Sequence, residues 1–129
     1  MSDKPSAIEF KTDRIVCIDR EDLHLFAEVI DTIAIDDRCW VRPLAIARST
    51  SESFKLEFLH DLRDAAQLIL PADLFRDALD TEVLPLISEL FHPDRDSTKS
   101  TNAQRVLYQF IAERYRYQQL PRVQNFDLR

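Results

Sequence analysis

The sequence predicts a single α+β domain: an antiparallel β-meander of three to four strands, followed by two to three C-terminal helices packed on one face. Two patterns predict this fold. Before Pro71, apolar residues form β-branched runs or alternate with polar ones, as in strands. After Pro71, they recur every three or four positions, as in helices. We expect the domain to span residues 8–129, with residues 1–7 as a disordered lead.

The first strands are predicted from β-branched residues. Ile15–Ile18 is a short β-branched run and reads as a strand. The segment Leu23–Ile35 fits both a helical face and strict alternation. Its β-branched density from Val29 onward favours a strand in that part.

A hairpin is predicted next. Trp40–Ala47 is its first strand, and Pro43 belongs at an edge or a bulge because proline cannot donate a ladder hydrogen bond. Polar residues over Arg48–Ser53 make the turn, and Phe54–Phe58 alternates as a half-buried strand. Gln67–Leu70 is a short fourth strand that ends at proline.

Two helical segments are expected directly after Pro71. Asp73–Leu79 reads as a short amphipathic turn, and Asp80 can cap a helix that runs to Phe91. Pro85, near the start of that helix, should kink it or delay its regular hydrogen bonding. The residues expected to face inward are Val83, Leu84, Ile87, Leu90 and Phe91.

The third helix has the strongest pattern in the chain. Thr101 and Gln104 have the spacing of a capping box. Leu120–Pro121 is expected to end the helix. Its inward positions are expected to be Val106, Leu107, Phe110 and Ile111.

The absence of glycine limits the chemistry of this chain. None of the 129 residues is glycine, so the phosphate-binding loop, the dinucleotide fingerprint and the G-x-S-x-G elbow are all missing. Turns must then rely on residues such as Asp36 and Asp37. These exclusions favour a non-catalytic protein that holds no cofactor.

Charge and cysteine usage indicate the compartment. The net charge of −6 disfavours a surface built broadly for nucleic acid or anionic lipid. No stretch approaches the roughly 20 apolar residues of a membrane span, and the N-terminus has no secretory pattern. Cys17 and Cys39 each lie in an apolar run and are expected to be buried, reduced thiols. A cytoplasmic location is therefore predicted.

The triplet His92, Pro93 and Asp94 resembles the signature of J-domain co-chaperones. As in that family, an aromatic residue precedes it and a helix follows. The resemblance implies a loop between two antiparallel helices that touches a chaperone ATPase. The family's preceding helix is basic, however, whereas Asp80–Glu89 contains no Lys or Arg. Such an acidic helix would repel the partner, which favours a plain helix-to-helix connector.

The histidines show no metal-ligand spacing. No two of His24, His60 and His92 are three or four residues apart, and no cysteine pairs with them at ligand spacing. We therefore expect them to be surface or loop residues and predict no metal site and no catalytic residues.

The C-terminal segment is locally basic. From residue 105 onward five arginines stand against two acidic residues, and arginines alternate with tyrosines. Arg and Tyr are enriched in protein interfaces, and they also stack on RNA bases. The residues that we expect to bind a partner are Arg114, Arg116, Tyr117 and Arg122. A protein partner is preferred and RNA is the alternative; a J-domain-like co-chaperone is the further one.

Two runs of the chain, residues 28–48 and 61–86, are similar to a group of small cytosolic cyanobacterial proteins of unassigned function. This resemblance implies the cytosol of a photosynthetic bacterium. It implies no functional residues.

Overall fold

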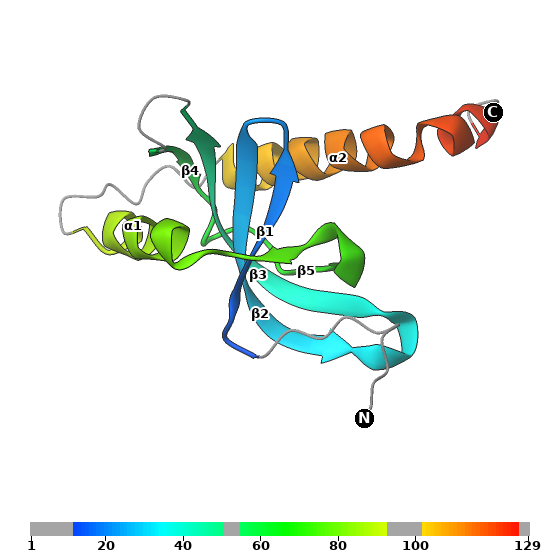
Figure 1. Ribbon diagram of the computed structural model, residues 1–129. Helices are drawn as coiled ribbons and strands as arrows, with labels where there is room; N and C mark the ends of the chain where they lie inside the picture. The colour runs from blue at the N-terminus through cyan, green and yellow to red at the C-terminus, as the bar shows by residue number, and fades with distance from the viewer. Residues whose placement is uncertain (1–11, 51–54, 93–101, 127–129) are drawn as a thin grey trace.

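The computed structural model describes residues 12–50, 55–92 and 102–126, with the backbone alone for 115–126 (Figure 1). Within these ranges lie strands β1 (Ile15–Arg20), β2 (Leu23–Ile33), β3 (Arg38–Ser49), β4 (Leu56–Asp61), β5 (Leu68–Pro71) and β6 (Arg76–Asp77), and helices α1 (Asp80–Leu90) and α2 (Ala103–Phe126). The α+β class is confirmed. The predicted disordered lead lies outside the described residues.

The six strands form one antiparallel sheet. Its order is β4-β3-β2-β1-β6, and β5 pairs with β3. The long strand β3 pairs with β5 through Arg38–Val41 and with β4 through Ala45–Ser49. The prediction of three to four strands was thus too low. The sequence missed β6, because its two residues are too short to show alternation and are fixed by pairing with β1.

Strand β2 resolves the ambiguity over Leu23–Ile35. The whole of Leu23–Ile33 is a strand, and a single turn of 3-10 helix follows it at Ala34–Asp36. The strand pairs with β1 on one side and β3 on the other, so ladder hydrogen bonds decide a conformation that periodicity left open.

Pro43 lies at a β-bulge, as one of the two predicted alternatives requires. Phe26 pairs with Ala45 and Ala27 pairs with Pro43, so Leu44 is the extra residue of β3. The turn between β2 and β3 also follows the prediction. Asp37 adopts a left-handed conformation with φ 55°, a position that glycine commonly fills.

The two helices cover opposite faces of the sheet, which corrects the prediction of helices on one face. Val16 and Ile18 belong to the cluster that holds Leu107 of α2. Cys17, which points the other way, belongs to the cluster that holds Leu86 of α1. All three β1 residues are fully buried, and a continuous apolar run is typical of a strand covered on both faces.

Helix α1 differs from its prediction in its cap and its buried face. Leu79 is the N-cap, so Asp80 is the first helical residue and not the cap. The buried residues are Leu86 and Leu90, whereas the predicted Leu84, Ile87 and Phe91 are exposed by 70%, 37% and 68%. The helix has apolar residues on two sides, so its periodicity alone could not say which side is buried.

The segment before α1 also corrects a prediction. In place of an amphipathic turn over Asp73–Leu79, a 3-10 turn spans Ala72–Leu74 and strand β6 follows at Arg76–Asp77. Strand β6 lies against β1, and the Arg76 side chain bonds Asp19 and Glu82. These long-range contacts override the local pattern.

Helix α2 buries Leu107 and Phe110 as predicted, with Val106 and Ile111 packed against the same cluster. It does not end at Leu120–Pro121 but continues to Phe126. A helix can accommodate proline by a local bend with loss of one hydrogen bond. Figure 1 shows the second half of α2 continuing past the edge of the sheet.

Candidate functional site

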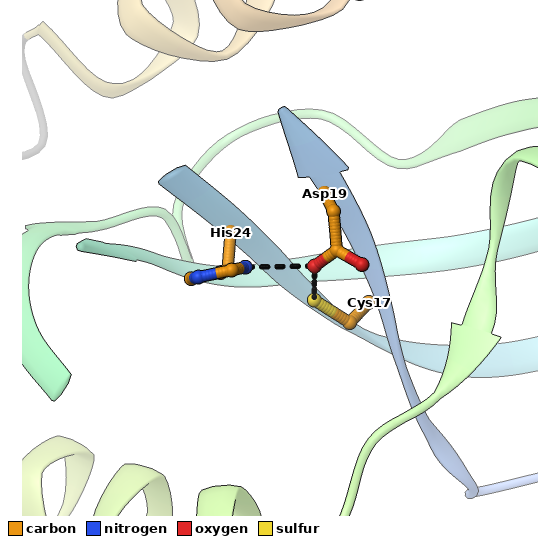
Figure 2. A group of neighbouring side chains, drawn as sticks. All are labelled: Cys17, Asp19 and His24. Atoms are coloured by element: carbon orange, nitrogen blue, oxygen red, sulfur yellow. Dashed lines mark hydrogen bonds and ion pairs between the residues drawn. The ribbon is translucent and has the colours of Figure 1, made fainter. Parts of the chain in front are cut away.

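The β1–β2 hairpin brings three chemically active side chains together (Figure 2). Asp19 of β1 lies directly opposite His24 of β2 in the ladder. Cys17 lies two residues before Asp19 and therefore on the same face of the sheet. The Cys17 thiol, one carboxylate oxygen of Asp19 and one ring nitrogen of His24 all lie within 4.8 Å of one another.

Asp19 is the acceptor at the centre of this cluster. Its Oδ1 accepts a hydrogen bond from the Cys17 thiol at 3.3 Å and lies 2.7 Å from Nδ1 of His24. Arg76 donates from Nε to Oδ2 at 2.7 Å and from an Nη2 amine to Oδ1 at 3.1 Å. Several donors thus converge on one carboxylate that is 42% exposed.

Arg76 extends the network to α1. Its guanidinium bonds both carboxylate oxygens of Glu82, at 3.0 and 2.9 Å. Glu82 in turn accepts the backbone N–H of Leu79 at 2.8 Å, which satisfies one of the free donors at the start of α1. The network therefore joins β1, β6 and the first turn of α1.

Ser49, near the end of β3, completes the cluster on its other side. Its hydroxyl lies 3.0 Å from Nε2 of His24, so Ser49, His24 and Asp19 form a hydrogen-bonded chain. The order matches the nucleophile, base and carboxylate of serine hydrolases. That chemistry also needs donors placed for an oxyanion and a cleft for substrate.

The network sets the protonation of its acids. The hydrogen bond with His24, helped by those from Arg76, holds the pKa of Asp19 well below its ordinary value although burial opposes this. Burial acts to raise the pKa of Glu82, but its bonds to Arg76 and Leu79 outweigh burial and lower it. Bonds to Glu82 and then Asp19 raise the pKa of Arg76. All three groups are therefore charged at neutral pH.

The two cysteines are buried and free, as the sequence predicts, and they lie in different clusters. Burial, helped by the neighbouring Asp19 carboxylate, raises the pKa of Cys17 far above its ordinary value. Burial alone raises the pKa of Cys39 to about 11. Both thiols are therefore protonated at neutral pH, and Cys17 alone has acidic and imidazole neighbours.

A groove lies on the opposite face, between α2 and the strands. Its volume is about 210 Å³. Arg20 donates to Glu113 at 2.9 Å across it and stacks over the Phe110 ring at 4.9 Å. His60 also lines the groove, and burial lowers its pKa. The remaining lining residues are Leu23, Ile46, Arg48, Leu59, Val106 and Gln109.

The residues predicted to bind a partner all lie in α2. Arg114 donates from Nε to the backbone carbonyl of Asp19 at 3.0 Å, so it also fastens α2 to the β1–β2 hairpin. Arg116, Tyr117 and Arg122 follow in the second half of the helix, where the side chains lie outside the described residues.

The predicted co-chaperone triplet is described only in part. His92 follows Phe91, the C-cap of α1, and its N–H donates to the Glu89 carbonyl at 3.4 Å. Pro93 and Asp94 lie outside the described residues.

The spacing of Cys17, Asp19 and His24 in the sequence is not that of ligands on a helix, so it did not predict this cluster. The signal lies in the hairpin: Arg20 pairs with Leu23 across a two-residue turn. The two-residue turn at Glu21–Asp22 fixes the register of the hairpin. Asp19, one position before Arg20, therefore lies opposite His24, one position after Leu23. The contribution of Arg76 could not be found this way, since it comes from a distant strand.

Comparison with protein-family models, curated proteins and solved structures finds no match to this chain. Among the residues that the structure describes, no helix has both the length and the apolar character needed to cross a bilayer.

Proposed function

We propose that this protein is a non-catalytic protein-binding domain. The observation that carries the proposal is a row of exposed apolar side chains on the outer side of α1. Leu84, Ile87 and Phe91 are exposed by 70%, 37% and 68%. Their spacing of three and four residues places them side by side along one helix face.

This row is more than scattered surface hydrophobicity. Single exposed apolar residues are normal, whereas a contiguous row is typical of an interaction surface. The guanidinium of Arg63 lies 5.5 Å from the centre of the Phe91 ring, so one end of the row has a cation stacked on it. Large apolar side chains beside an arginine are a common composition at the centre of protein interfaces.

The charge of α1 indicates the chemistry of the partner. The helix carries Asp80 and Glu89 and no Lys or Arg, and the charge of its third carboxylate, Glu82, is already paired with Arg76. A partner segment with apolar residues at helical spacing and basic residues at its edges would complement both properties. We therefore propose a basic amphipathic segment as the partner of α1.

The basic C-terminal part of α2, from Arg114 onward, is a further proposed contribution. Arg114, Arg116, Tyr117 and Arg122 belong to a helix that continues past the sheet (Figure 1). Arg and Tyr are suited to a protein interface, and RNA is the alternative ligand for the same residues.

Binding assays with matched variants test the proposal. We would capture partners from native lysate with the wild type, with Leu84→Ser/Phe91→Ser, and with Ile35→Ser, which changes an isoleucine exposed by 88% elsewhere. We expect the α1 double variant alone to lose the partner, in lysate treated with nuclease as in untreated lysate. Full binding by a folded double variant would refute the role of α1.

The salt dependence of binding to the purified partner separates the two ligand classes. A protein partner should give a shallow dependence on salt, because few counterions are released. A steep dependence, together with loss of capture after nuclease treatment, would establish RNA as the ligand. If RNA is the ligand, we expect an Arg116→Ala/Arg122→Ala variant to lose binding.

A further inference from the structure

Three ligand groups suited to zinc converge on the α1 face of the sheet. Thiolate, imidazole and carboxylate are the groups that Zn²⁺ accepts in proteins. The Cys17 Sγ, an Asp19 oxygen and a His24 nitrogen lie within 4.8 Å of one another, and the three come from one rigid hairpin (Figure 2). We propose that Cys17, Asp19 and His24 bind a single Zn²⁺ ion, with water in the fourth position.

The hydrogen bonds of the metal-free protein already define the position of the ion. Cys17 Sγ and His24 Nδ1 both approach the same atom, Asp19 Oδ1, at 3.3 and 2.7 Å. Ligand bonds to zinc are about 2.3 Å from sulfur and about 2.0–2.2 Å from nitrogen or oxygen. The three side chains therefore need only a small separation to admit the ion. On binding, the Cys17 thiol proton passes to the buffer and a Zn–S bond replaces the S–H bond.

The outer partners of two ligands are also those of a metal site. A histidine that binds metal through one ring nitrogen usually donates the other N–H to an oxygen, and a ligating carboxylate is itself hydrogen-bonded. Here Nε2 of His24 lies 3.0 Å from the Ser49 hydroxyl oxygen. Oδ2 of Asp19 accepts from Arg76 Nε at 2.7 Å, so the carboxylate stays held when Oδ1, which also accepts from Arg76 Nη2 at 3.1 Å, binds the metal.

Arg76 must release two contacts for the ion to enter. Its Nη2 amine lies 3.1 Å from Asp19 Oδ1 and 3.5 Å from Cys17 Sγ. Its Nη1 keeps a bond to Glu82 Oε1 at 3.0 Å and its Nε keeps Asp19 Oδ2 at 2.7 Å, so the guanidinium can tilt about these two bonds and move Nη2 away. Arg76 therefore stays anchored when the metal takes Oδ1.

The charges of the loaded site would balance. Asp19, Glu82 and the Cys17 thiolate carry three negative charges, and Arg76 and Zn²⁺ carry three positive ones. A buried charge is costly unless it is compensated, so this balance favours binding of a divalent cation. The Asp19 side chain is 42% exposed and that of His24 is 12% exposed, so the fourth position is open to water on the Asp19 side.

Metal titration of the full chain tests the proposal. Chelator-treated protein would be titrated with Co²⁺ alone, whose thiolate complexes absorb in the near ultraviolet, and with Zn²⁺ against a chromophoric chelator. We expect one equivalent of metal and a thiolate–cobalt band. Cys17→Ser should abolish the band, and Cys39→Ser, which changes the other buried thiol, should retain it.

Two further variants test the ligand set when Cys17→Ser fails to fold. His24→Gln should weaken Zn²⁺ binding by roughly 100-fold or more, and Ser49→Ala by about 10–100-fold, as outer partners of metal ligands commonly do. Absence of the cobalt band in the wild type, a band that depends on Cys39, or full zinc affinity in folded His24→Gln would each overturn the proposal.

Discussion

The two faces of the sheet are built from alternate residues of the same strands, yet they differ in chemistry. On the α2 face, Val16, Ile18 and Leu25 pack with Leu107 and Phe110 in a large aliphatic and aromatic cluster. On the α1 face, a smaller cluster around Phe26 and Leu86 adjoins the polar network centred on Asp19. The first face is suited to stability. The second combines stability with ionic groups that fix geometry.

This difference shows how one strand can serve two purposes. In β1, Val16 and Ile18 face α2, whereas Cys17 and Asp19 face the side of α1. Apolar packing tolerates small shifts, whereas a hydrogen-bonded network loses energy when any member is left unpaired. Substitutions on the two faces should therefore differ in size and in their dependence on pH.

The largest effect is expected on the α2 face. Leu107 is fully buried, and Leu107→Ala should lower the free energy of unfolding by about 4 kcal/mol through lost apolar contact and a cavity. The adjacent Tyr108 is 57% exposed, so Tyr108→Ala should change the free energy of unfolding by less than about 0.5 kcal/mol. Urea denaturation measures both. Equal losses would show that α2 docks through another side.

A smaller loss is expected on the α1 face. Leu86 is fully buried in the smaller cluster, and Leu86→Ala should cost about 3 kcal/mol. Leu84→Ala is the matched control, because the same residue type two positions away is 70% exposed and should cost less than about 0.5 kcal/mol. If Leu84→Ala proved the costlier change, the assigned buried side of α1 would be wrong.

The sequence predicted the aliphatic face better than the polar one. The positions Leu107 and Phe110 follow from helical spacing, and the strand at Ile15–Ile18 follows from its β-branched run. The buried side of α1 did not follow, because apolar residues lie on two sides of that helix. The polar network depends on Arg76, which pairing with β1 brings beside Asp19 from 57 positions along the chain. Local pattern contains no signal for such a contact.

Breaking the polar network should cost less than either core substitution. Glu82→Gln removes the charge that bonds Arg76 at 3.0 and 2.9 Å, and should lower the free energy of unfolding by about 2 kcal/mol. Asp73 is exposed, so Asp73→Asn is the control and should leave the free energy of unfolding nearly unchanged. Chemical denaturation at neutral pH measures the difference. Equal stability of the two variants would mean that the network contributes nothing to folding.

Acid should weaken the α1 face selectively, because its network contains two carboxylates whose pKa values are lowered by their bonds. The pKa values of Glu82 and Asp19 are lowered in the folded protein from ordinary values of 4.5 and 3.8. The two carboxylates therefore contribute their full stabilisation of the fold above those values, and this stabilisation is lost as the pH falls below them. His24, Arg76 and Cys17 are the groups that face these carboxylates.

Denaturation of metal-free protein from neutral to acid pH measures this loss. Glu82→Gln should show a smaller dependence on pH than the wild type, since the variant lacks one of the two carboxylates. The same pH dependence in both proteins would contradict the assigned role of Glu82.

The smallest effect, none at all, is expected for His92→Gln in a chaperone ATPase assay. The resemblance to J-domains implies two antiparallel helices packed on each other, with a basic helix before the triplet. Here α1 and α2 pack on opposite faces of a sheet, and α1 contains no Lys or Arg. We therefore expect neither the wild type nor the variant to stimulate a bacterial chaperone ATPase, while a genuine J-domain in the same assay does. Stimulation by the wild type that His92→Gln abolishes would show that α1 and α2 act together as one unit. The different chemistry of the two sheet faces would then not be the basis of function.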